Sequence, residues 1–118
     1  MSSSSFGSWP VPVILATDYS GIAGHLKPAQ RRILKVLVHC IAINRELLAT
    51  EAEIDSAWVA AAIGSLDPKS RAVIEKRNGY PSLITLGLAT GKFVDLDGVT
   101  SSTYRITDEG RKVATLLP

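Results

Sequence analysis

The chain has 118 residues, of which 46% are hydrophobic and 20% are charged, and its formal net charge is +2. This composition is ordinary for one globular domain and excludes a disordered or fibrous chain. Because Cys40 is the single cysteine, no internal disulfide can form, which fits a reducing compartment, and we expect a cytoplasmic protein. We expect no membrane association and no secretory signal, since no apolar run is long enough and the N-terminus lacks a basic region.

The first 24 residues are predicted to form an arm, partly disordered, ahead of a domain covering residues 25–118. Ser2 to Ser5 is low in complexity, and prolines and glycines interrupt the segment that follows. We expect residues 1–8 to be mobile, because consecutive serines bury too little apolar surface to offset their ordering entropy.

A first strong helix is predicted from about Pro28 to Asn44. Proline suits a first helical turn, and Ile33, Leu37 and Ile41 recur at the spacing of one buried helical face. Further apolar residues widen this face beyond the needs of one core, namely Val36, Val38 and Ile43. We therefore expect a homodimer through this helix, unless Val11 to Leu15 of the arm cover the surface within one chain.

Two further helical segments follow. Glu46 to Ile63 is predicted to be helical with a break near Thr50, and Asp55 or Ser56 can cap its second half. The next helix is predicted from Pro68 to Arg77. An aspartate cap precedes its proline, and Asn78-Gly79 after it tolerates the left-handed conformation that ends helices.

The C-terminal part contains the strand signals. Leu83, Leu86 and Leu88 predict another short helix ending at Gly87. Strands are predicted at residues 92–96 and 103–107, with Asp97-Gly98 as the hairpin signal, and loops of two or four residues both fit. The threonine at position 107 can cap a last helix at residues 108–116.

This order of elements resembles the winged helix-turn-helix domains of transcriptional regulators. Members of that family commonly carry an L-x-x-L-G-L approach to the hairpin, matched here by residues 83–88. A Y-x-[LI]-T-x-x-G return strand and helix cap follow, matched by Tyr104 to Gly110. The likeness covers residues 27–118 in organisation and 83–111 in motif. It implies a mainly α fold with a small β-hairpin, and duplex DNA as the partner.

The resemblance places DNA recognition on the helix that follows Gly64-Ser65-Leu66. At about 100° per residue, Val73 and Ile74 face the core, while Lys69 and Arg71 point outward from the first turn. Cations there oppose the helix dipole, a cost that a phosphate or base edge would offset. Arg71 is the candidate for guanine contact and Lys69 for phosphate contact. The candidate DNA-binding residues are Lys69, Ser70, Arg71, Lys76, Arg77, Lys92 and Arg105.

The sequence also supports an alternative without DNA. Asp95 and Asp97 place negative charge near the hairpin tip, and from Glu46 to Asp55 every charged residue is acidic. A winged-helix module for protein–protein interaction or dimerisation would fit these features. We expect no enzyme activity, no metal and no cofactor, since no set of catalytic or metal-ligand residues has a workable spacing.

Overall fold

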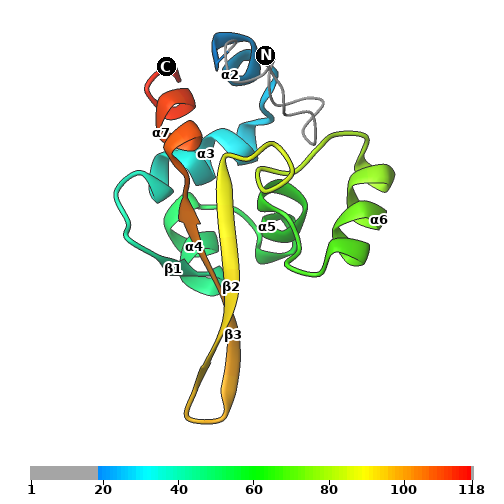
Figure 1. The fold of residues 1–118 in the computed structure, drawn as a ribbon, viewed down its shortest axis with the longest axis vertical. Coiled ribbons are helices and arrows are strands. Elements are labelled where there is room, and N and C mark those ends of the chain that lie inside the picture. The colour runs from blue at the N-terminus through cyan, green and yellow to red at the C-terminus, as the bar shows by residue number, and fades with distance from the viewer. Residues whose placement is uncertain (1–18, 118) are drawn as a thin grey trace, which may run out of the picture.

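The computed structural model describes residues 19–117 (Figure 1). These residues form a mainly helical α+β fold with one three-stranded antiparallel sheet. The elements in chain order are α2 (Tyr19–His25), α3 (Pro28–Leu37), β1 (Ile43–Asn44), α4 (Arg45–Ala52), α5 (Ser56–Ile63), α6 (Pro68–Asn78), β2 (Ala89–Leu96), β3 (Val99–Ile106) and α7 (Asp108–Ala114). None of the helices in this range is long and apolar enough to cross a membrane.

The packed core begins before the predicted boundary at residue 25. Helix α2 overlaps the segment predicted to be an arm, and its Ile22 and Ala23 belong to the core. The helix packs against α7 at the top of the view in Figure 1. The expectations for residues 1–8 and for Val11 to Leu15 concern residues outside the described range.

The first strong helix is shorter than its apolar pattern predicted. Helix α3 ends at Leu37, and the chain then turns so that Ile43 and Asn44 pair with β3. This pairing buries Ile43, while Val36 and Val38 pack against the core. The three residues that widened the apolar face therefore pack within one chain, and they leave no apolar surface that would support the expected homodimer.

Helices α3, α4 and α5 pack on one another as a three-helix unit. The break between α4 and α5 falls at residues 53–55 rather than near Thr50, and Glu53 takes the left-handed conformation at φ 57°. The Asp55 side chain accepts a hydrogen bond from the Ala57 amide at 3.0 Å, which confirms Asp55 as the cap of α5. A three-residue turn therefore joins α4 to α5.

The sheet has the order β1-β3-β2, and β2 and β3 form a hairpin whose outer part projects beyond the helices (Figure 1). The pairing of Leu96 with Val99 leaves Asp97-Gly98 as a two-residue loop, so the shorter of the two predicted loops is present. Both loop residues have positive φ, as a tight hairpin turn requires. The strands extend further than predicted, over residues 89–96 and 99–106.

The predicted helix near Leu83 to Gly87 is wrong, because the segment consists of turns. The Leu83 and Ile84 amides donate to the carbonyls of Ala62 and Ile63 at 3.0 Å each, so the segment satisfies the open C-terminal end of α5. Leu83 is also fully buried. The contacts of this segment with α5 therefore decide its conformation, although the spacing of its leucines is that of a helix.

The two sequence motifs that flank the hairpin, residues 83–88 and 104–110, contact each other in the structure. The Thr107 hydroxyl donates to the Gly87 carbonyl at 2.6 Å and accepts from the Gly110 amide at 3.0 Å, which confirms Thr107 as the cap of α7. Gly110 lies so close to the Leu88 carbonyl that a Cβ there would overlap it. Glycine is therefore required at this point of the motif for packing.

Candidate functional site

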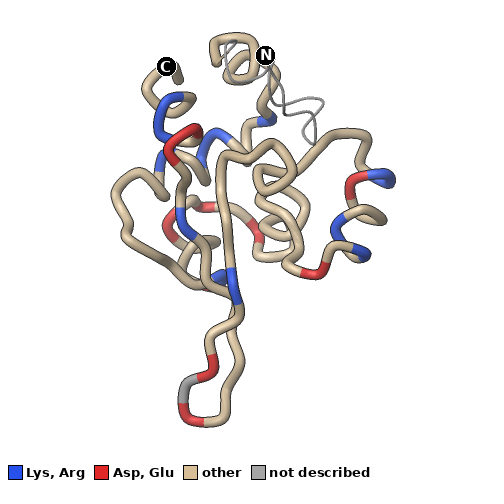
Figure 2. The backbone as a smooth tube through the Cα atoms, viewed as in Figure 1, with Lys and Arg blue, Asp and Glu red and all other residues tan. Residues whose placement is uncertain are grey.

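The structure separates the candidate DNA-binding residues into two groups. Five lie on α6, which stands at one side of the molecule, and two lie on the β2–β3 hairpin (Figure 2). The α6 group is described first.

Helix α6 has no buried residue, and the helix on which it packs is α5. The prediction that Val73 faces the core is wrong, since this side chain is 58% exposed, and Ile74 is only half-buried. Apolar burial therefore contributes little to the attachment of this helix.

Polar contacts attach α6 instead. The Glu75 carboxylate accepts hydrogen bonds from the Ser82 amide at 2.8 Å, the Ser82 hydroxyl at 2.7 Å and the Thr85 hydroxyl at 2.6 Å. Burial alone raises the pKa of Glu75, but these hydrogen bonds outweigh it and lower the pKa below its ordinary value. Glu75 is thus held ionised, with its charge directed toward the body of the protein.

Arg71 and Ser70 also have structural partners. The Arg71 guanidinium donates to the Ser65 carbonyl at 3.1 Å and is half-buried, so the prediction that Arg71 points outward is wrong. The Ser70 hydroxyl donates to the Asp67 carboxylate at 2.8 Å, and the Ser70 amide donates to it at 3.3 Å. These bonds, the hydroxyl first, lower the pKa of Asp67 and confirm it as the cap of α6.

The remaining cations of α6 are exposed, and they are among the few Lys and Arg side chains that have no partner within the described residues. Most of the 13 Lys and Arg side chains have a hydrogen bond, a ring contact or another partner. Within residues 19–117, the basic side chains without such a partner are Lys69, Lys76, Arg77, Lys92 and Arg105. All five are among the candidate residues, and all five are exposed.

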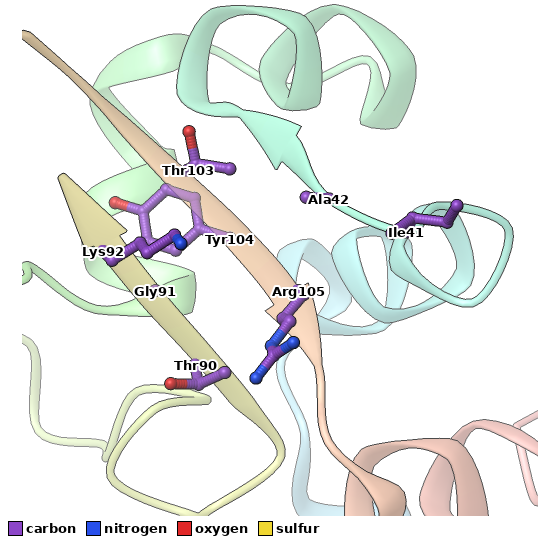
Figure 3. Close-up of a pocket in the computed structure, with 8 residues that line it drawn as sticks. All are labelled: Ile41, Ala42, Thr90, Gly91, Lys92, Thr103, Tyr104 and Arg105. Carbon is purple, nitrogen blue, oxygen red and sulfur yellow. The ribbon is translucent and has the colours of Figure 1, made fainter. Parts of the chain in front are cut away.

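Lys92 and Arg105 lie on the outer face of the sheet, opposite the face that Tyr104 and Ile106 present to the core. The register pairs Thr90 with Arg105 and Lys92 with Thr103, which places all four side chains on this face. They line a hollow of about 320 Å³, shown in Figure 3. The full lining is Ile41, Ala42, Thr90, Gly91, Lys92, Thr103, Tyr104 and Arg105.

The sequence also offered the hydroxyls of residues 100–103 as donors to phosphate, which includes Thr103, whereas Thr90 and Ile41 of this hollow were not among the sequence-based candidates. A signal for the threonines is present in the chain, since Thr90 precedes Lys92 by two residues and Thr103 precedes Arg105 by two. Residues two apart in a strand share a face. No comparable signal places Ile41 there, because its position depends on the chain turn after α3.

Acidic residues occupy other surfaces. Glu46 and Glu51 are exposed on α4, Glu53 and Asp55 are exposed in the turn that follows, and α5 contains no Lys or Arg. Figure 2 shows acidic positions also at the hairpin tip, as expected from the sequence. The described part of the chain holds no group of three His, Cys, Asp or Glu side chains that could bind a metal.

Comparison with known proteins assigns the chain to no family. No protein-family model matches the chain, and no curated protein is significantly similar to it.

Proposed function

We propose that the chain is a winged helix-turn-helix protein that binds duplex DNA, with α6 as its main phosphate-contacting element. The observation that carries the proposal is the set of exposed cations without protein partners on α6, namely Lys69, Lys76 and Arg77. The β1-β3-β2 sheet, the α4–α5 pair with its three-residue turn and the projecting hairpin support the fold assignment.

The electrostatics of α6 favour a polyanion. The carboxylates of Asp67, which caps the helix, and of Glu75 are engaged in hydrogen bonds within the protein, and neither forms an ion pair with Lys69, Lys76 or Arg77. A lysine or arginine that contacts a phosphate displaces a condensed counterion, and this gives the complex affinity that falls with salt. Lys76 and Arg77 in the last turn, and Lys69 in the first, are placed to make such contacts along the helix.

The salt dependence of binding to a random-sequence duplex, measured by fluorescence anisotropy, tests this role. Each lost phosphate contact should reduce the slope of log K against log salt by about 0.9. We expect Lys76→Ala to reduce the slope by this amount. Lys112→Ala is the matched control, since it removes an equal charge from the last turn of α7, where Lys112 lies over the Tyr19 ring. Equal slopes for the two variants would contradict a role for α6.

A protein-binding module is the second candidate, and the α4–α5 surface favours it. If α4 and α5 form the helix-turn-helix, the second helix that would read DNA is α5, whereas the sequence placed recognition on the helix that is α6. Helix α5 carries no basic residue and exposes 56% of Trp58, next to the acidic turn at Glu53 and Asp55. Absence of duplex binding at low salt would favour this candidate over DNA binding.

A further inference from the structure

The hollow on the outer face of the sheet has the features of an anion-binding site. Neither Lys92 nor Arg105 has a side-chain partner within residues 19–117, and none of the eight lining residues is acidic. The two cations are diagonal neighbours across β2 and β3, about 7–8 Å apart at the backbone. Two like charges at that spacing repel each other, and an anion between them would remove the repulsion.

The threonines supply hydrogen-bond donors beside these charges. Thr90 lies directly opposite Arg105, and Thr103 lies directly opposite Lys92 (Figure 3). Neither hydroxyl has a hydrogen-bond partner in the described part of the chain. A guanidinium, an ammonium and two hydroxyls together match a phosphate group, whose oxygens accept several hydrogen bonds and favour a planar arginine.

The remaining wall of the hollow is apolar. Ile41 is 94% exposed, and it stands with Ala42 on the loop that leads into β1. Arg111 donates to the Val38 carbonyl at 3.4 Å and so attaches the start of this loop to α7. Beyond Arg105 an adjoining hollow is lined by Asp108 as well as Arg111, so charges of both signs surround it. The combination suits one phosphate joined to an organic group.

We propose that this hollow binds one phosphate group of an organic phosphate, with Arg105 and Lys92 as charge partners and Thr90 and Thr103 as donors. Ile41 and Ala42 contact the organic part. The phosphate comes from a free nucleotide or from a nucleic-acid backbone, and both present the same chemistry to these side chains. The site lies on the sheet and does not depend on the proposed role of α6.

Titration of the full chain with adenosine monophosphate, followed by amide and methyl NMR shifts, tests for a free nucleotide. We expect saturable shifts at Thr90, Thr103 and Ile41. Arg105→Ala should weaken binding by about tenfold or more, because it removes a bidentate charged contact. Thr103→Val, which keeps the β-branched shape, should weaken it by roughly threefold. Lys112→Ala is the control, since it removes an equal charge from α7, where Lys112 lies over the Tyr19 ring, and it should leave the affinity unchanged.

Binding of a random-sequence DNA oligonucleotide to the same variants and to Arg77→Ala tests for the nucleic-acid source. If the phosphate belongs to a backbone, adenosine monophosphate gives no saturable shifts, while Arg105→Ala and Thr103→Val both weaken oligonucleotide binding. The proposal is overturned if the variants at positions 103 and 105 match the parent with both probes. Loss of oligonucleotide binding by Arg77→Ala alone would support α6 and contradict the hollow, so the two proposals fail separately.

Discussion

Replacing Gly110 with alanine should destabilise the protein, although alanine is the better helix former. The added Cβ would overlap the Leu88 carbonyl oxygen and lie 2.6 Å from Cγ1 of Ile106 and 3.0 Å from the Leu88 carbonyl carbon. The Leu88 carbonyl cannot rotate aside freely, because it accepts the Thr107 amide hydrogen bond at 3.1 Å. Backbone displacement between β2 and α7 is therefore required.

The expected magnitude follows from two opposing effects. Alanine in a helix interior is favoured over glycine by about 1 kcal/mol. Overpacking of a tight site costs about 1–3 kcal/mol, and more where backbone must move. Since the nearest atoms here belong to backbone, we expect a net loss of about 2 kcal/mol in the free energy of unfolding. With a urea m-value of about 2 kcal/mol/M, the midpoint should fall by roughly 1 M.

Gly24→Ala provides the matched control in urea unfolding followed by circular dichroism. Gly24 also lies in a helix, α2, but no atom stands within 4 Å of a Cβ built there. This variant should keep the parent midpoint or raise it, by up to about 1 kcal/mol in free energy. A Gly110→Ala midpoint equal to or above that of the parent would refute the close contact between α7 and residue 88.

Three further predictions concern polar contacts. Thr107→Ala should lower the free energy of unfolding by about 1–2 kcal/mol in urea titrations, since it removes the α7 cap and the bond to Gly87, and an unchanged midpoint would exclude that cap. Gln30→Leu should cost about 2 kcal/mol by the same measurement, because the buried Gln30 amide donates to the Ala62 and Pro81 carbonyls, and a stabilised variant would contradict this. Glu75→Gln should be less stable than the parent at neutral pH. The lowered pKa of Glu75 means that this difference is full above pH 4.5 and shrinks as the pH falls through the folded-state pKa, so a constant difference from pH 7 to 3 would exclude the ionised carboxylate.

Local chemistry made the helix starts predictable. Asp55, Asp67 and Thr107 were each expected to cap a helix, and each side chain accepts an amide hydrogen bond from the first turn that follows it. The signal depends on residues two or three positions apart, so it needs no knowledge of the tertiary structure. The hairpin turn at Asp97-Gly98 is predictable for the same reason, although its length was not, since loops of two and four residues both fitted the sequence.

The wrong predictions involve contacts between distant segments. The apolar spacing after Leu37 suggested a continuing helix, but Ile43 is buried by pairing with Tyr104, 61 positions along the chain. The leucines at 83 and 88 likewise suggested a helix, whereas bonds to α5 hold that segment in turns. The apolar patterns identify Ile43, Leu83 and Leu88 as buried, but not the partners that bury them. They also place Ile41 on a buried helical face, and this prediction is wrong because the side chain is 94% exposed.

In the candidate site, the sequence pattern likewise did not identify the partners of the charged residues. Helical periodicity assumes that a helix attaches by its apolar side, and on that assumption Val73 was placed inward and Arg71 outward. The observed attachment of α6 uses Glu75 and Arg71, whose partners are a serine, a threonine and a backbone carbonyl. The side directed to solvent was therefore assigned incorrectly for these two residues, although the free cations were identified.

The attachment of α6 also explains how a chain of net charge +2 can present a basic surface. The carboxylates of Asp67 and Glu75 are committed to hydrogen bonds that cap and anchor the helix, while Lys69, Lys76 and Arg77 extend into solvent. The acidic residues of α4 and the following turn lie elsewhere in the sequence and structure. Net charge therefore averages over surfaces of opposite sign. We infer that phosphate binding depends on cations without internal partners, and within residues 19–117 these cations lie on α6 and on the hairpin.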